Sequence, residues 1–365
     1  MRILLLGEYS NVHATLAKGL RQLGHDVTVA SNGDFWKDYP RDIDLNRREG
    51  RLGGVRLMLR MRRELPKMRD YDIVQFINPM FLELKAERIE AVYEQLRRNG
   101  NKRFVLGAYG MDYYWVNTCC EEKPLRYSDF NIGSELRTNA DALRERKDWL
   151  GTAKQRLNER MAREADAIVA GLYEYYVCYH PVFPGKTSFI PFGIELGETP
   201  EITTSAKLRL FIGINKTRSE YKGTDIMLRA AKDVEARYPD RVELKIAESV
   251  PFDEYKEMMK GSDAILDQLY SYTPSMNPLQ AMSQGLICVG GGEPENYEIL
   301  GETELKPIVN VEPEYESVVS ALEWLVMHPE RIAEMRRQSV EYVRKHHEMM
   351  KVAGEYEKLY EELLK

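Results

Sequence analysis

Residues 272–298 read YTPSMNPLQAMSQGLICVGGGEPENYE, and this stretch decides how the second half of the chain folds. Asn277 is a preferred residue at a helix start, Pro278 suits the first helical position, and Gln280 can complete a capping box. Gly285 then ends a short helix, and the apolar run LICV that follows is typical of a buried strand. We therefore expect a helix, a strand and a glycine-rich turn, in that order.

A helix that begins on a loop beyond a strand presents backbone N–H groups and the positive end of its dipole. Such a position suits an anion, and a diphosphate in particular. The same pattern is equally typical of a well-capped helix that lies between two strands and binds nothing. Both interpretations stay open on this stretch alone.

Short apolar runs alternate with amphipathic segments along nearly the whole chain, as in β-α units that build a parallel sheet. Two series of such units flank the polar stretch GIELGETPEITTSAK at 193–207. Helices are predicted at 85–98 and 224–238. The predicted strands are 2–6, 26–30, 72–77, 103–108, 167–170 and 187–190 in the first series, and 208–213, 242–247, 264–269, 286–289 and 308–311 in the second.

The fold predicted from this pattern is α/β, with two doubly wound parallel-sheet domains. We place the first domain at 1–194 together with 347–365, the linker at 195–206, and the second domain at 207–346, a division that suits a chain of 365 residues. In this class, ligands bind beyond the carboxyl ends of the strands, here in the cleft between the domains. An apolar stripe in the tail needs a surface to cover it: Met349, Val352, Tyr356, Leu359, Tyr360 and Leu363.

The composition excludes several classes of protein. A net charge of -6 argues against a dedicated nucleic-acid-binding protein. No run of about 18 apolar residues occurs, and the opening MRILLLGEY is too short in apolar residues for a signal peptide. The four cysteines form no Cys-x-x-Cys pair and the six histidines show no metal-ligand spacing. We therefore expect reduced thiols, no metal or other cofactor, and a cytoplasmic location.

The stretch from 272 to 298 resembles retaining glycosyltransferases of the large family 4 (group 1). These carry a Glu, seven residues and a second Glu within an EGFGLxxLEAMACGxPVV segment, followed by Gly-Gly-x-x-Glu. This chain has LQAMSQGLICV and then Gly291-Gly292-Glu293-Pro294-Glu295, aligned without a gap. The resemblance implies the GT-B fold, in which two Rossmann-like domains face a central cleft and the last helix crosses back to the first domain. It also implies metal-independent, retaining transfer of a sugar from a nucleotide-diphosphate-sugar donor.

Two positions depart from the family pattern. The first Glu falls on Tyr272, and the second falls on Gln280. In the family the first carboxylate lies near the transferred sugar, and the second holds the ribose hydroxyls. Gln280 still donates and accepts hydrogen bonds, whereas Tyr272 supplies no carboxylate. The donor-binding residues expected on this stretch are Tyr272, Ser275, Asn277, Leu279, Gln280 and Glu295.

A basic segment upstream resembles another part of the family pattern. Phe211-Ile212-Gly213 is followed by Asn215-Lys216-Thr217-Arg218 and by Tyr221-Lys222-Gly223-Thr224, as in the family's Gly-Arg segment and its Lys-Gly before a helix. We expect Lys222, with Lys216 or Arg218, to neutralise the leaving diphosphate, which would make a divalent metal unnecessary. The alternative is that these cations are solvated on a surface loop.

The first half offers two catalytic candidates, His13 and Asp112. The turn GEYSNVH at 7–13 lacks Gly-x-Gly-x-x-Gly, which argues against a nicotinamide enzyme, and resembles the family's first turn. In the family, the residue at the position of Gly7 approaches the donor and a His stands at the start of the helix, so the resemblance implies these roles for Gly7 and His13. GAYGMD at 107–112 resembles the family's His-Gly-x-Asp, with Tyr109 in place of the His, so Asp112 would hydrogen-bond a sugar or acceptor hydroxyl. The alternatives are an ordinary polar residue for His13 and a turn cap for Asp112.

A basic and apolar segment at 47–69 indicates what kind of partner the chain could bind. It holds nine Arg or Lys residues against two Glu, interleaved with Val55, Leu57, Leu59, Met61 and Leu65. Several GT-B enzymes dock on anionic lipid through such a surface, so the sequence predicts peripheral contact with the inner face of a membrane. An acidic glycan or a lipid-linked acceptor would also suit it, and a solvated amphipathic helix is the alternative without a partner.

Three functions remain open on these residues. The first is a glycosyltransferase that acts on a glycan, lipid-linked or small-molecule acceptor. The second is a catalytically reduced GT-B protein that binds nucleotide or glycan, which the departures at Tyr109, Tyr272 and Gln280 favour. The third is a nucleotide-sugar epimerase, for which acidic and histidine groups are scarce. Release of nucleoside diphosphate in the presence of an acceptor separates the first from the second, and donor conversion without an acceptor would indicate the third.

Overall fold

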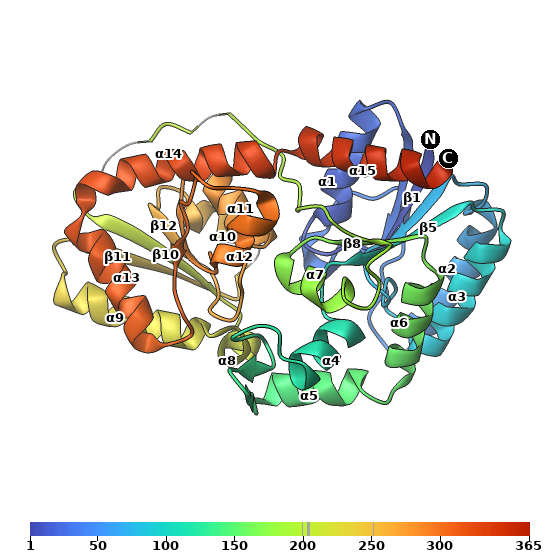
Figure 1. Ribbon diagram of the computed structural model, residues 1–365, viewed down its shortest axis with the longest axis horizontal. Helices are drawn as coiled ribbons and strands as arrows, with labels where there is room; N and C mark the ends of the chain where they lie inside the picture. Colours follow the sequence, from blue (N-terminus) through green and yellow to red (C-terminus); the bar gives the residue numbers. More distant parts are fainter. Residues whose placement is uncertain (199, 203–204, 251) are drawn as a thin grey trace. The chain divides into compact units, whose positions relative to one another are not determined.

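The computed structural model describes residues 1–198, 200–202, 205–250 and 252–365, which divide into two compact units. Unit 1 comprises Met1–Thr118, Glu145–Gly193 and Met349–Lys365. Unit 2 comprises Cys119–Arg144 and Ile194–Glu348. Each unit is built on its own parallel sheet with helices packed on it, which confirms the predicted α/β class (Figure 1).

The sheet of unit 1 has seven parallel strands in the order β3-β2-β1-β4-β5-β8-β9. Its central strands are apolar on both faces because helices cover both sides, and Ile3 to Leu6 of β1 are wholly buried. The strands are β1 (Arg2–Leu6), β2 (Asp26–Ser31), β3 (Ile43–Asp44), β4 (Ile73–Phe76), β5 (Arg103–Ala108), β8 (Ala167–Ala170) and β9 (Thr187–Phe189). Its helices include α1 (Val12–Gln22), α2 (Gly53–Glu64), α3 (Ala86–Arg98), α6 (Ala153–Glu164) and α7 (Tyr173–Tyr179).

The last helix, α15 (Met349–Leu364), belongs to unit 1, as predicted. It packs side by side with α1, and a Cβ on Gly19 would lie only 2.7 Å from the Cβ of Ala353 (Figure 1). The hydroxyl of Tyr360 donates to Oε1 of Gln75 at 2.6 Å in the interior. The Arg103 side chain donates to the carbonyl of Leu363 at 2.6 Å. The tail therefore completes the core of unit 1 instead of extending from it.

The sheet of unit 2 has five parallel strands in the order β11-β10-β12-β13-β14. They are β10 (Leu208–Ile214), β11 (Val242–Glu248), β12 (Ala264–Leu266), β13 (Ile287–Gly290) and β14 (Val309–Asn310). The helices of this unit are α8 (Ser219–Lys222), α9 (Thr224–Arg237), α10 (Phe252–Met259), α11 (Met276–Ser283), α12 (Pro294–Leu300), α13 (Tyr315–Met327) and α14 (Pro329–His346), with a short helix η3 (Lys216–Arg218) after β10. The apolar face of α9, which includes Met227, Ala230 and Val234, packs in the core of this unit.

The predicted domain limits differ from the structure at residues 119–144, which lie in unit 2 and not with the rest of 1–194. The physical reason is a set of hydrogen bonds. The Arg137 guanidinium donates to the carbonyls of Glu220 at 2.9 Å and Tyr221 at 3.0 Å. This segment includes a small hairpin, β6 (Asn131–Ile132) and β7 (Glu135–Leu136), that the sequence pattern does not predict. In the predicted linker 195–206, residues 199, 203 and 204 lie outside the described residues.

Loss of the Tyr360 hydroxyl tests whether α15 is part of the core of unit 1. In Tyr360→Phe the carbonyl oxygen of the Gln75 side chain loses its donor, and a buried acceptor without a partner costs about 1–3 kcal/mol. We expect the free energy of unfolding to fall by this amount in a urea titration monitored by circular dichroism.

Lys358→Gln is the matched control, because Lys358 lies on the exposed side of the same helix. Deletion of residues 348–365 should lower the melting temperature far more than either substitution. A truncated chain that melts at the temperature of the full chain would show that α15 is dispensable for the fold.

Candidate functional site

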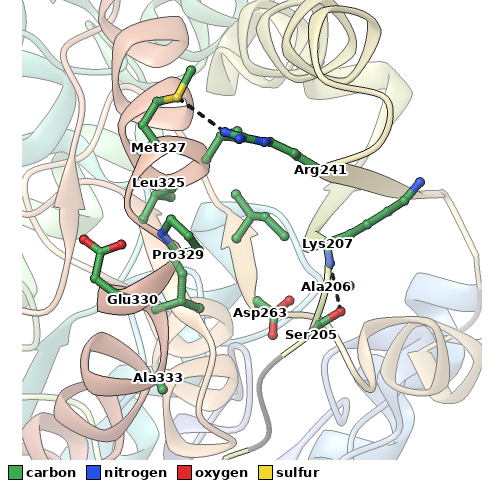
Figure 2. Close-up of a pocket in the computed structure, with 13 residues that line it drawn as sticks. Ser205, Ala206, Lys207, Arg241, Asp263, Leu325, Met327, Pro329, Glu330 and Ala333 are labelled. Atoms are coloured by element: carbon green, nitrogen blue, oxygen red, sulfur yellow. Dashed lines mark hydrogen bonds between the residues drawn. The ribbon is translucent and has the colours of Figure 1, made fainter.

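In the parallel sheet of unit 2, the amino ends of the strands form one edge and the carboxyl ends form the opposite edge. Only the carboxyl edge has the chemistry of a ligand site. A pocket of about 350 Å³ lies at the amino edge, next to Lys207, Asp263 and Glu330 (Figure 2). Asp263 is buried there between Arg209, at 2.9 Å, and Arg336, at 2.7 Å, so its carboxylate serves to hold the unit together. Ligands of doubly wound sheets bind at the opposite, carboxyl edge. The predicted cations and the start of α11 lie at that edge.

The three predicted cations follow β10 in different environments. Lys216 is exposed and pairs with Glu248 at 2.9 Å. The guanidinium of Arg218 lies 5.0 Å from the ring centre of Tyr221, and its buried Nε has no hydrogen-bond partner among the described residues. Lys222 is half-buried. Arg218 and Lys222 thus lie closer to the protein interior than a solvated loop would place them.

The end of α8 places Lys222 beside the segment after β12. The backbone N–H of Leu269 donates to the carbonyl of Lys222 at 3.0 Å. Gly223 takes a positive φ of 74°, and a Cβ there would lie 2.8 Å from the Cβ of Leu269. The Lys-Gly pair therefore has a structural reason: only glycine permits this turn and this close approach.

Asp267, which the sequence analysis does not single out, lies at the same edge directly after β12. The amide of Asn277 hydrogen-bonds its carboxyl group, and the charge of Lys222 acts on it. Desolvation is the largest effect and raises the pKa of Asp267 to about 6, against the opposing effects of Lys222 and Asn277. The two groups that lower the pKa of Asp267, Lys222 and Asn277, thus come from two other segments at this edge.

The start of α11 corrects the predicted cap. The helix begins at Met276 with Ser275 at the N-cap position, two residues earlier than the predicted cap at Asn277. Asn277 instead accepts a hydrogen bond from the Tyr255 hydroxyl at 3.1 Å. Gln280 donates to Ser283 at 3.2 Å and does not complete the predicted capping box. The reason is that the helix begins two residues earlier than predicted, so Asn277 already lies inside its first turn and Gln280 does not stand at the third helical position.

Two predicted donor-binding side chains lie in the interior of unit 2. Tyr272 is 1% exposed, and its hydroxyl accepts a hydrogen bond from the backbone N–H of Arg126 at 2.7 Å. The Arg126 guanidinium also lies over the Tyr272 ring, 4.9 Å from its centre. Leu279 is fully buried. The tyrosine at the position of the family's first Glu therefore anchors the 119–144 segment to unit 2.

The glycine turn after β13 fixes the two glutamates that follow it. A Cβ on Gly291 would lie 2.1 Å from the carbonyl oxygen of Ser271, which explains why glycine is required there. Glu293 then accepts from Arg126 at 2.5 Å and from the Tyr127 hydroxyl. Glu295 also pairs with Arg126, at 2.8 Å. The predicted donor contact of Glu295 stays a prediction, and its observed partner is the Arg126 guanidinium.

In unit 1, the polar side chains of the first turn after β1 form hydrogen bonds within the protein. His13 is fully buried, donates from Nδ1 to the Gly7 carbonyl at 2.8 Å and lies 3.3 Å from the Gln75 amide. Burial lowers the pKa of His13 to about 3, so the ring is neutral. Glu8 accepts from the N–H of Ala14 at 2.8 Å and thus occupies the start of α1. A Cβ on Gly7 would lie 2.3 Å from the Ile77 side chain.

Asp112 is also buried and acts as a cap for α4 (Tyr113–Glu121). Its carboxylate accepts from the backbone N–H of Trp115 at 2.9 Å and from the Tyr179 hydroxyl at 2.7 Å. Burial raises its pKa to about 6. The contacts of His13 are thus those of an ordinary polar residue at a helix start, and the contacts of Asp112 are those of a cap. A catalytic role for either residue stays a prediction.

Sequence patterns miss three groups near these positions: Glu8, Arg126 and Asp267. Glu8 and Asp267 each stand at the carboxyl end of an apolar run, which is the signal that could have identified them. Arg126 lies in a segment without periodicity and carries no such signal. Among the described residues, no cluster of His, Cys, Asp and Glu could hold a metal ion.

Neither protein-family models nor curated proteins give a match to this sequence. Several solved structures do match. HepE (Alr3699) of Anabaena, in complex with UDP and glucose, has a TM-score of 0.60 at 13% identity, covering 99% of this chain and 100% of that chain. Sucrose-phosphate synthase of Thermosynechococcus elongatus has a TM-score of 0.62 at 13% identity, covering 100% and 99%. A glycosyltransferase of Rickettsia africae has a TM-score of 0.59 at 12% identity, covering 100% and 98%. At such identities the likeness concerns the fold alone, and it shows that this chain has the GT-B fold with two Rossmann-like units.

Proposed function

We propose that this chain transfers a glycosyl group from a nucleotide-diphosphate-sugar donor to an acceptor. The observation that carries the proposal is the position of Arg218, Lys222 and the start of α11, which all lie at the carboxyl edge of the sheet of unit 2. HepE, which shares the fold, has been solved with UDP and with UDP-glucose. A diphosphate is the anion that two neighbouring cations and a helix N-terminus bind together.

The cations would act on the leaving group. Negative charge grows on the diphosphate as the bond to the sugar breaks, and Lys222 and Arg218 would stabilise that charge more in the transition state than in the ground state. The Nε of Arg218, which has no hydrogen-bond partner among the residues that the structure describes, would supply a further donor for a phosphate oxygen. With two fixed cations the reaction would proceed without a divalent metal. Retention of the anomeric configuration follows from the family resemblance alone, and NMR of the product anomer decides it.

A second candidate, a GT-B protein that binds nucleotide without transferring sugar, is favoured by one observation. Tyr272 replaces the family carboxylate and is buried as an anchor for the Arg126 backbone. In that case nucleotide would bind, but no acceptor would release nucleoside diphosphate from the donor. Donor conversion in the absence of an acceptor would instead indicate an epimerase.

Nucleotide binding is the first prediction of the proposal. In calorimetric titrations with UDP, GDP, ADP and CMP, in the presence of a metal chelator, we expect one diphosphate to bind. Lys222→Ala should weaken that binding by about 10- to 100-fold, because a charge-assisted hydrogen bond contributes about 1.5–3 kcal/mol.

Lys232→Ala is the matched control, because Lys232 is an exposed lysine of α9 in the same unit. It should bind the same nucleotide with unchanged affinity. If none of the four nucleotides binds to the full chain, the donor site does not exist and the transferase proposal is wrong.

We also propose that the acceptor side of this chain contacts an anionic membrane through α2. Leu52, Val55 and Leu59 are more than half exposed on or beside this helix. A cavity of about 970 Å³ lies against it. Six Arg or Lys residues line this cavity against three acidic residues: Arg47, Arg51, Arg62, Lys85, Arg88 and Lys154, against Glu83, Glu87 and Asp148. Apolar side chains beside a surplus of cations match a bilayer of anionic lipid. No helix of the described residues could span a bilayer.

Vesicle flotation tests the membrane contact. The protein should float with vesicles that contain phosphatidylglycerol and stay behind with pure phosphatidylcholine. Arg51→Gln combined with Arg62→Gln should weaken binding by about 30-fold, since each cation near the surface contributes about 1 kcal/mol. The control is the same double change at the exposed Arg98 and Arg156, which lie outside this surface. Equal loss in both double variants would show that only net charge matters and would exclude a docking surface at α2.

A further inference from the structure

The short helix α8, which ends at Lys222, depends on contacts from outside itself. It has only four residues, and a single turn of this length is not stable alone. The last carbonyls of a helix also have no partner within it. Here Arg137 donates to the carbonyl of Glu220 from Nη2 at 2.9 Å and to that of Tyr221 from Nη1 at 3.0 Å. The N–H of Leu269 donates to the carbonyl of Lys222 at 3.0 Å. The last three carbonyls of α8 therefore each have a donor from another segment.

Arg137 belongs to the 119–144 segment, and its guanidinium binds backbone. The side chain is 8% exposed. It also donates to the carbonyls of Ser128 at 3.3 Å and Asp129 at 3.2 Å. A guanidinium reaches several carbonyls at once through its planar fork of donors, which the ammonium group of a lysine cannot do. Arg137 thus links its own segment to α8 through four hydrogen bonds to backbone carbonyls.

The same guanidinium also packs on the segment that follows β12. Its central carbon lies over the ring of Tyr270, 3.3 Å from the ring centre. A Cβ on Gly223 would lie 3.0 Å from a ring carbon of Tyr270, so this ring also packs on the residue after Lys222. The backbone is therefore held on both sides of Lys222, by Arg137 before it and by Tyr270 after it.

Tyr221 extends the influence of Arg137 to the second cation of the proposed donor site. Its side chain is 1% exposed, and its ring lies 6.4 Å from that of Phe130 in the 119–144 segment. The guanidinium of Arg218 lies 5.0 Å from the centre of this ring, and that of Arg137 lies 5.9 Å from it. A shift of α8 would therefore move the surface on which Arg218 rests as well as the backbone of Lys222.

We propose that Arg137 is a positioning residue for the donor diphosphate, because it holds α8 so that Lys222 and Arg218 are in place before the donor binds. The proposal rests on the proposed function, which assigns these two cations to the diphosphate. Cations that are already ordered lose less conformational entropy on binding and stabilise the growing charge without rearrangement. Without Arg137, the donor itself would have to order α8, and its affinity would fall by that cost.

Arg137→Lys tests the proposal, because it keeps the positive charge and loses the planar fork of donors. The probes are UDP, GDP and ADP, titrated by calorimetry. For the nucleotide that binds the unmodified chain, Arg137→Lys should weaken binding about 10-fold. In the background of Lys222→Ala the same change should weaken binding by about 3-fold at most, since only the placement of Arg218 is then left to lose. Equal factors in both backgrounds would show that Arg137 does not act through Lys222 and would overturn the proposal.

Arg336→Lys is the matched control, because Arg336 is another buried arginine of unit 2 and lies at the opposite, amino edge. Its guanidinium donates to the Gly285 carbonyl at 2.6 Å and pairs with Asp263 at 2.7 Å. This variant should lower the melting temperature at least as much as Arg137→Lys and leave nucleotide affinity unchanged. Equal weakening by both variants would mean that affinity follows overall stability, and the positioning role would be refuted.

Two changes at Tyr270 form a second test that leaves Arg137 in place. Tyr270→Phe keeps the ring under the guanidinium, so nucleotide affinity should not change. Tyr270→Leu removes the ring and should weaken binding, by a smaller factor than Arg137→Lys. Equal affinity of the two variants would show that this contact does not position the cations.

Hydrogen exchange provides a measurement without nucleotide. The amide of Leu269, which donates to the carbonyl of Lys222, should exchange faster in Arg137→Lys than in the unmodified chain, and at an unchanged rate in Arg336→Lys. An unchanged rate in Arg137→Lys would overturn this inference while the proposed function stands. If none of the three nucleotides binds the unmodified chain, the proposed function and this inference are refuted together.

Discussion

Unit 2 depends on the close approach of two backbone segments at the carboxyl edge of its sheet. A side chain on Gly291 would collide with the carbonyl of Ser271, so only glycine lets these segments meet. The N–H of Glu293 then donates to the Tyr272 carbonyl at 3.1 Å. Tyr272 is buried as a result, and Glu293 is placed where it meets Arg126. The attachment of residues 119–144 to this unit therefore depends on a glycine far away in the sequence.

The strand and helix periodicity predicts the two sheets because their central strands are buried on both faces and read as unbroken apolar runs. β1, β5 and β8 begin and end where the pattern places them. β12 ends earlier than predicted, since Leu269 bonds to the Lys222 carbonyl and leaves the ladder. The two-residue strand β3 is too short for any periodicity, and the hairpin of β6 and β7 has only a short local signal, its Gly133-Ser134 turn with a positive φ of 57° at Gly133.

Site residues could be predicted only where a local pattern marks them. The Lys-Gly pair before α9 marks Lys222, because the positive φ of Gly223 is a local requirement. Asp267 has no such mark, because the two residues that lower its pKa, Lys222 and Asn277, come from separate segments of the chain. His13 and Asp112 show the reverse case. Their motifs are local and visible, but the contacts that engage them come from Gln75 and Tyr179, which the sequence does not place nearby.

The two positions at which the family pattern would place carboxylates hold Tyr272 and Gln280. Tyr272 is buried, and its hydroxyl accepts a hydrogen bond from the Arg126 backbone, whereas Gln280 donates to Ser283 of its own helix. Neither side chain carries a charge, so an acidic group that acts on a sugar in this chain would have to come from another position than these two. The resemblance therefore extends further in the backbone of this stretch, with its helix, strand and glycine turn, than in the side chains at the two carboxylate positions.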